Sequence, residues 1–155
     1  VSSLSGVYGI KRYIGDSYQS ANFWFNEIDT DTDSKSMSNR EKKFIANTEA
    51  QWFFDSWFAL CSLRVYKESG DVGFYNNAIK YMNRSLSQLT DSDMYTANTD
   101  KVKGMQLPES YNFLYYENMI MAVPSPITPL NWAKASLTLL LKEMVIANQK
   151  YNKDA

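Results

Sequence analysis

Residues 50–66 read AQWFFDSWFALCSLRVY, an almost unbroken apolar and aromatic run. Thr48 and Glu49 precede it, a combination typical of the first turn of a helix. We therefore expect a helix from about residue 48 to 67, ended by Gly70. The apolar residues fall on nearly every side of this helix and not on one stripe, which predicts that it is buried on all faces.

Two further helices are expected downstream. Asp71 is placed to cap a helix over 72–89, in which apolar residues recur every three or four positions and leave one polar face. Asn131 is placed to cap a last helix over 132–148, whose central stretch is again mostly apolar. Two helices buried all round need more neighbours than this chain supplies, so we expect it to pack against other material.

The remaining segments are expected to be loops. Residues 1–28 contain glycines that interrupt any long helix, and residues 29–40 form a polar run. Residues 90–130 contain all four prolines and are expected to be irregular. Loops longer than about 15 residues are usually functional in compact domains, so the chemistry is expected on the loops.

The run at 29–40 also invites a calcium-loop interpretation, because Asp29, Asp31 and Asp33 alternate. Its sixth position is Ser34 where glycine is required, and its twelfth is Arg40 where a bidentate glutamate belongs. A solvated acidic loop is favoured, and no metal or cofactor is expected.

Composition narrows the classes of function. The chain has 155 residues, with 16 Lys+Arg against 17 Asp+Glu, no histidine and one cysteine, which we expect to be a small core residue. A balanced charge argues against nucleic acid or an anionic membrane as a partner. The absence of histidine excludes Ser-His-Asp and Cys-His nucleophile systems within the chain. With no long apolar run, a soluble chain is expected. Carboxylate chemistry or plain binding remains.

Two clusters carry such chemistry. Glu109 follows Pro108 in the long loop and is surrounded by aromatic residues that include Tyr111. A carboxylate among aromatics is a candidate acid or base, although a surface glutamate beside an apolar contact is the simpler alternative. Arg12 and Asp16 lie four residues apart in a glycine-containing loop. They would clamp hydroxyl groups, or form an ordinary exposed ion pair.

Taken in order, four segments resemble the C-terminal part of glycoside hydrolase family 15, the glucoamylases, and the glucoamylase-like domain of phosphorylase kinase regulatory subunits. GIKRYIGDSY at 9–18 resembles the family's Gly-x-x-Arg-Tyr-Pro-Glu-Asp-x-Tyr loop, with Ile14-Gly15 in place of Pro-Glu. EAQWFFDSWFAL at 49–60 resembles the inner helix that follows, and LPESYN at 107–112 the loop that bears the general base. PLNWAKASLTLLL at 129–141 is similar to the closing helix.

This resemblance implies an all-α fold, part of an (α/α)6 toroid of the six-hairpin glycosidase type with long active-site loops. Residues 1–155 would be the C-terminal portion of one such domain, with 29–40 as a polar loop and 90–130 as a long functional loop. The remaining N-terminal part of the same protein would then be a partner of this chain.

The resemblance also implies inverting hydrolysis of the α-glucosidic bonds of an α-glucan or maltooligosaccharide. Glu109 matches the general base, and the general acid would lie outside the chain. Arg12, Asp16, Trp52 and Trp132 match residues near the sugar, and Tyr111 is a further candidate for sugar binding. Two alternatives remain: an inactive regulatory toroid that binds glycan or a partner, and a helical interaction module unrelated to the family.

Overall fold

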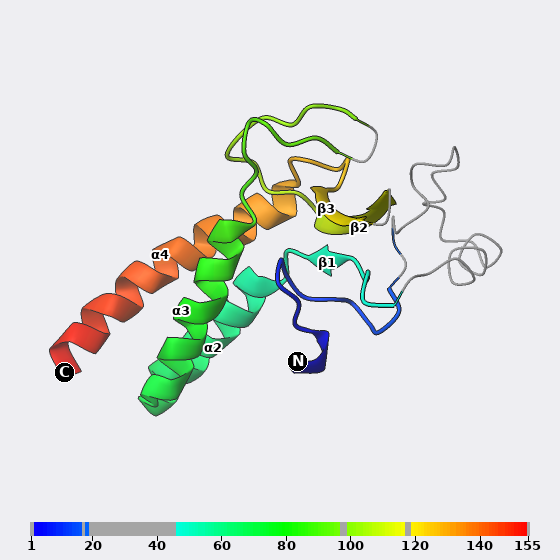
Figure 1. The fold of residues 1–155 in the computed structure, drawn as a ribbon. Helices are drawn as coiled ribbons and strands as arrows, with labels where there is room; N and C mark the ends of the chain where they lie inside the picture. Colours follow the sequence, from blue (N-terminus) through cyan, green and yellow to red (C-terminus); the bar gives the residue numbers. More distant parts are fainter. Residues whose placement is uncertain (1, 17, 19–45, 97–98, 117–118, 155) are drawn as a thin grey trace.

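The computed structural model describes residues 2–16, 18, 46–96, 99–116 and 119–154. Within them the chain forms a short 3-10 helix η1 (Ser2–Leu4), three α-helices and three strands. Figure 1 shows the helices α2 (Asp55–Ser69), α3 (Val72–Ser87) and α4 (Asn131–Asp154) gathered on one side of the sheet. The sheet and the N-terminal segment lie at the end of this bundle where α2 begins.

Helices α2 and α3 form a hairpin whose turn was well signalled by the sequence. Gly70 adopts a left-handed conformation with φ 73°, and its N–H donates to the Tyr66 carbonyl at 2.8 Å. The Asp71 carboxylate then accepts the N–H of Gly73 at 2.8 Å and so caps α3. Glycine tolerates the left-handed region and aspartate satisfies a free helical N–H, so the predicted helix stop and cap are confirmed.

The main core lies among the three helices. Leu63 and Tyr66 of α2 are almost fully buried, as is Leu140 of α4. A pair of hydroxyl groups, Ser56 and Ser136, lies 2.8 Å apart between α2 and α4. Other buried members of this core are Phe53, Ala59, Tyr75, Ala78, Leu107, Ala133, Leu137, Met144 and Ala147.

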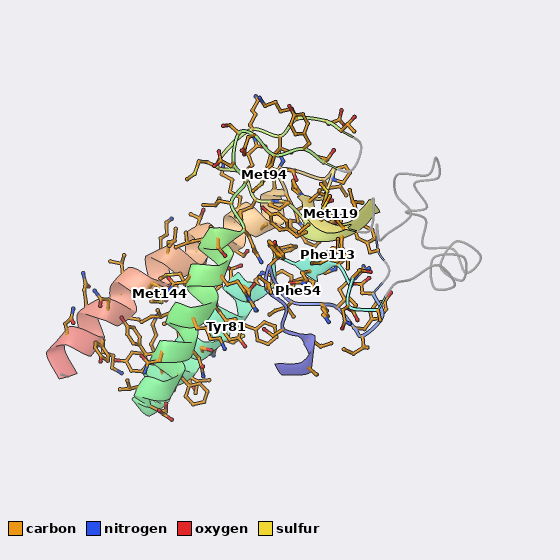
Figure 2. The ribbon with its side chains drawn as sticks, viewed as in Figure 1. Phe54, Tyr81, Met94, Phe113, Met119 and Met144 are labelled. Atoms are coloured by element: carbon orange, nitrogen blue, oxygen red, sulfur yellow. The ribbon has the colours of Figure 1, made fainter. Side chains whose placement is uncertain are left out.

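The sheet is antiparallel in the order β1-β2-β3. Strand β1 (Gln51–Trp52) pairs with the start of β2 (Ser110–Tyr116), Gln51 opposite Tyr111 and Trp52 opposite Ser110. Strand β3 (Met119–Pro124) pairs with β2 along its length. In Figure 2 the labelled Phe113 and Met119 lie at this hairpin, while Phe54 lies at the junction between sheet and helices.

The fold is therefore mixed α/β, and the prediction of an all-α (α/α)6 toroid is wrong. The hairpin of β2 and β3 occupies the segment 90–130 that was expected to be irregular. Its strands are rich in aromatic and β-branched residues, which pack well on a pleated surface. The first long helix also starts later than predicted, at Asp55 and not at 48, because Gln51 and Trp52 pair in the sheet.

The prediction that two helices are buried on all faces is also wrong. On α2, Trp57 is 43% exposed and Cys61 is exposed instead of lying in the core. On α4, Val145 is 60% and Ile146 52% exposed. Among the described residues, the three helices and the small sheet leave an outward apolar face on both α2 and α4.

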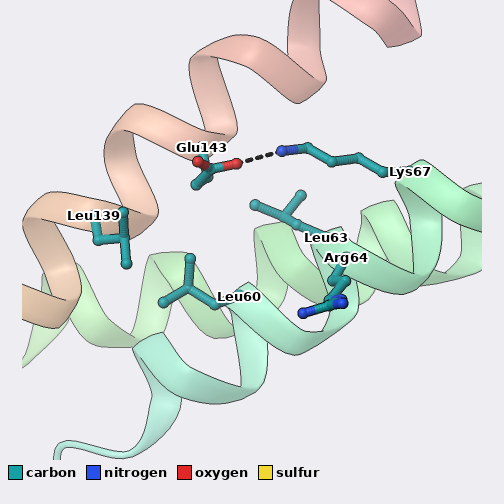
Figure 3. A pocket seen from close by; sticks show the side chains of 6 residues that line it. All are labelled: Leu60, Leu63, Arg64, Lys67, Leu139 and Glu143. Atoms are coloured by element: carbon teal, nitrogen blue, oxygen red, sulfur yellow. Dashed lines mark hydrogen bonds and ion pairs between the residues drawn. The ribbon is translucent and has the colours of Figure 1, made fainter.

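A shallow pocket of about 310 Å³ lies between α2 and α4. Figure 3 shows the ion pair of Lys67 and Glu143 at its rim, with leucine side chains below it. None of the residues predicted from the sequence to form a site lines this pocket. A search of the described helices finds none long and apolar enough to span a membrane.

Candidate functional site

Three segments that are distant in sequence meet beside β1. Ile10 and Trp52 exchange two backbone hydrogen bonds, of 3.2 and 2.9 Å, which places the N-terminal segment along β1. On its other side β1 pairs with β2, so Trp52 lies opposite Ser110. The loop containing Arg12, the strand containing Trp52 and the residue before β2, Glu109, are thereby brought together.

Asp16 is the acceptor at the centre of this meeting point. Its carboxylate is fully buried and accepts two hydrogen bonds from Arg12, Nε to Oδ2 at 2.8 Å and Nη2 to Oδ1 at 2.7 Å. The indole N–H of Trp52 donates to Oδ2 at 3.0 Å. The Arg12 guanidinium also lies 4.1 Å from the Trp52 ring centre. Such bidentate, charge-assisted geometry fixes the planes of both side chains.

Tyr18 connects this cluster to Glu109. Its hydroxyl donates to Glu109 Oε2 at 2.8 Å, and its ring lies 5.0 Å from that of Trp52. Among the hydrogen bonds of the described residues, this one is the single bond to the Glu109 carboxylate. The carboxylate is partly buried, and its second oxygen has no hydrogen-bond partner among the described residues.

The backbone around Glu109 is held independently of that cluster. The Glu109 N–H donates to the Ile127 carbonyl at 3.0 Å, and the Leu130 N–H donates to the Leu107 carbonyl at 2.8 Å. Three residues after Glu109, buried Asn112 accepts the Ser110 hydroxyl at 2.8 Å. The segment that enters α4 thus positions the general-base candidate from one side, and Tyr18 reaches it from the other.

A second ion pair supports the loop that carries Arg12 and Asp16. Lys11 Nζ lies 3.0 Å from Glu49 Oε2, and the Gly15 N–H donates to Glu49 Oε1 at 3.4 Å. Burial acts to raise the pKa of Glu49, but Lys11 and the backbone N–H donors more than offset this and lower the pKa below its ordinary value. Gly15 has φ 81°, a conformation that suits glycine, where the resembling family has glutamate.

The two other predicted site residues lie differently. Tyr111 is 3% exposed, stacks on Tyr8 with ring centres 5.2 Å apart, and donates its hydroxyl to the Gln88 carbonyl at 3.1 Å. Trp132 is 71% exposed on the first turn of α4. The structure brings together Arg12, Asp16, Trp52 and Glu109. Tyr111 lies in the core and Trp132 on the surface, and the roles of these two residues stay predictions.

Sequence reasoning gave Tyr18 no role, although it belongs to the quoted loop motif. Gln51 was also missed: its side-chain oxygen accepts the N–H of Tyr8 at 2.7 Å and of Gly9 at 3.2 Å. A glutamine beside an aromatic run carries no sequence signal for such a role. The acidic run at 29–40 lies outside the described residues, and within them no group of three His, Cys, Asp or Glu side chains is placed to hold a metal.

The arrangement places a cation, a carboxylate and an aromatic ring beside one another. Arg12 supplies the cation, Glu109 supplies the carboxylate, and Tyr18 supplies a half-buried ring between them, while Trp52 lies buried behind Arg12. Comparisons with protein-family models, with curated proteins and with solved structures give no match for this chain.

Proposed function

We propose that the chain carries the base half of a glycosidase site that hydrolyses α-glucosidic bonds in an α-glucan. In this proposal Glu109 is the general base that activates water. Arg12, the exposed member of its cluster, holds sugar hydroxyls, while buried Asp16 and Trp52 fix the plane of its guanidinium group. Exposed Trp132 is a further proposed contact for a longer glucan chain, whereas buried Tyr111 would act only by supporting the site from the core.

The observation that carries the proposal is the contrast between Glu109 and its neighbouring carboxylates. Asp16 is paired with Arg12, and Glu49 is paired with Lys11. Glu109 instead accepts a hydrogen bond from the neutral hydroxyl of Tyr18. Within the part of the chain that the structure describes, no cation pairs with Glu109, and this supports its choice as the general base.

Inverting hydrolysis also needs a general acid, with its carboxyl group about 6.5–9.5 Å from that of the base. The buried Asp16 carboxylate already accepts N–H groups from Arg12 and Trp52, and Glu49 is paired with Lys11, so neither is placed to donate a proton to the leaving oxygen. We propose that the acid lies outside this chain, in the N-terminal part of the same protein.

The test is Glu109→Gln in the complete protein, incubated with a maltooligosaccharide while released β-glucose is measured. Loss of a general base is expected to lower turnover by at least about 100-fold. Glu143→Gln is the matched control, because it alters a carboxylate between α2 and α4 that has no contact with the site. Turnover near that of the unmodified protein in Glu109→Gln would refute the assignment.

A protein that binds glycan without cleaving it is the second candidate. It is favoured by the pairing of Asp16 with Arg12 and of Glu49 with Lys11, which leaves neither of these two carboxyl groups available as the general acid. Calorimetric titration with maltooligosaccharide separates the two. Binding that is weakened by Arg12→Ala, with no β-glucose released by the unmodified protein, would favour the binding protein.

A further inference from the structure

A buried polar cluster of Asp55, Arg84 and Gln88 lies at the base of the N-terminal segment. Asp55 begins α2 and is fully buried, and the Arg84 side chain is 15% exposed. Arg84 Nε donates to Asp55 Oδ1 at 2.9 Å, and Gln88 Nε2 donates to Asp55 Oδ2 at 3.0 Å. The cluster joins the first turn of α2 to the last turn of α3. We call it the Arg84 cluster.

The same donors also bind the backbone of the N-terminal segment. Arg84 Nη1 donates to the Gly6 carbonyl at 2.5 Å and to the Ser5 hydroxyl at 2.6 Å. Gln88 Nε2 donates to the Tyr8 carbonyl at 2.5 Å. Arg84 and Gln88 therefore each bind two groups: the Asp55 carboxylate on one side and the segment of residues 5–8 on the other.

Close approach of this segment depends on glycine. A Cβ atom at Gly9 would lie 2.4 Å from the Trp52 carbonyl oxygen and 2.8 Å from Gln88 Nε2. A real Cβ atom is not found at such short distances. The backbone at this position can approach the cluster only because Gly9 has no Cβ atom. The segment is therefore fitted to the cluster and does not merely lie over it.

The chain then runs directly from the cluster into the candidate site. Ile10, next after Gly9, pairs with Trp52, and Arg12 follows two residues later. The Arg12 guanidinium lies over the Trp52 ring and holds Asp16. Trp52 itself lies three residues before Asp55. Arg12 and Trp52, which contact each other, are therefore both connected to the Arg84 cluster through short stretches of backbone.

We infer that Arg84 is a positioning residue: through the backbone of residues 5–9 it sets the place of Arg12 and Asp16 relative to Trp52. A buried ion pair is by itself weak evidence for stability, since apolar residues of similar size often serve as well. Apolar residues would not hold the carbonyls of Gly6 and Tyr8, and this is what the cluster adds. The consequence for substrate rests on the proposed function.

Two variants separate positioning from simple stability. Arg84→Lys keeps a cation beside Asp55, but one ammonium group cannot replace the planar set of donors that reaches Gly6 and Ser5. Gln88→Met leaves the Asp55–Arg84 ion pair and removes the donor to the Tyr8 carbonyl. Glu143→Gln is the control, because it breaks an ion pair between α2 and α4 that does not contact the N-terminal segment.

The first measurement is hydrogen exchange by mass spectrometry in the complete protein. Both variants are expected to speed exchange in peptides covering residues 4–12 by about tenfold, with exchange in the buried part of α4 unchanged. The Glu143→Gln control is expected to leave residues 4–12 as they are. Unchanged exchange at 4–12, or equal acceleration throughout the protein, would overturn the inference.

The second measurement is hydrolysis of maltooligosaccharide. Because Ile127 and Leu107 hold the backbone around Glu109 independently, we expect KM to rise about three- to tenfold while kcat stays within about twofold. A fall in kcat with constant KM would contradict positioning of the sugar-holding loop. If the unmodified protein releases no β-glucose, the proposed function fails, and the exchange measurement alone decides the role of Arg84.

Discussion

Replacing Asp16 with asparagine removes the acceptor on which two segments of the candidate site converge. In the protein the Asp16 carboxylate accepts N–H groups from Arg12 and from the Trp52 indole. Asparagine offers only one acceptor oxygen. Its NH2 group would face an N–H donor of Arg12 or Trp52 in place of the second carboxylate oxygen. The substitution keeps the size of the side chain, so the change measures hydrogen bonding and charge and not lost volume.

The expected cost follows from the exposure of the two donors. Arg12 is 35% exposed at its side chain, so water recovers much of the charge-assisted bonding that it loses. The single oxygen of asparagine cannot replace both carboxylate oxygens, and Trp52 is only 7% exposed, so water does not compensate for the weakened bond of its indole N–H, at a cost of about 1–3 kcal/mol. Together we expect Asp16→Asn to lower the free energy of unfolding by about 2–4 kcal/mol.

Urea unfolding followed by tryptophan fluorescence and circular dichroism measures this cost. Glu68→Gln is the matched control, since Arg64 and Glu68 have the same spacing as Arg12 and Asp16 but are 83% and 70% exposed at their side chains. That exposed pair is expected to contribute only about 0.3–0.5 kcal/mol. Equal costs for Asp16→Asn and Glu68→Gln would refute the view that the buried Asp16 carboxylate organises Arg12 and Trp52.

Two further predictions concern groups with shifted pKa values. The pKa of Glu49 is lowered by Lys11 below its ordinary value of 4.5, so this stabilisation is present above pH 4.5 and lost as the pH falls through the lower, folded-state value. In urea unfolding, the stability difference between the unmodified protein and Glu49→Gln should shrink from about pH 6 to pH 3, and a difference independent of pH would contradict the ion pair. Burial, with a smaller effect of Tyr8, raises the pKa of Tyr111 from 10.0 to about 12, so the stability that its neutral hydroxyl gives is present below pH 10.0 and lost as the pH rises through about 12. Tyr111→Phe should lower the free energy of unfolding by about 1–2 kcal/mol at neutral pH, because the hydrogen bond to the Gln88 carbonyl is lost. The same change at exposed Tyr95 should leave the free energy of unfolding almost unchanged. Equal losses in the two variants would contradict a stabilising role for the Tyr111 hydroxyl.

The end of α2 and the start of α3 were predictable because each depends on one residue that meets a local backbone requirement. Gly70 and Asp71 each satisfy a backbone requirement that depends on no distant residue, so the turn between α2 and α3 followed from the sequence. The start of α2 did not, because Gln51 and Trp52 are drawn into the sheet by Ser110 and Tyr111. That pairing joins residues far apart in the chain, and no local pattern encodes it.

The sheet was missed for a related reason. The prolines in 90–130 predict an irregular stretch, yet Pro124 is the last residue of β3 and neither β2 nor β3 contains another proline. In the candidate site, the loop motif identified Arg12 and Asp16, and the structure adds Tyr18 as the link to Glu109. Gln51 and Arg84 act on backbone atoms of another segment, a role that residue type alone does not indicate.

The link from Tyr18 to Glu109 also bears on the order in which the protein folds. It joins residues 91 positions apart, whereas the hairpin of α2 and α3 is closed by a single tight turn. Closing a longer loop costs more chain entropy, and contacts between distant residues form more slowly than local ones. We expect the helical hairpin to form first and the candidate site to assemble last, when the N-terminal segment docks against a preformed β1 and β2.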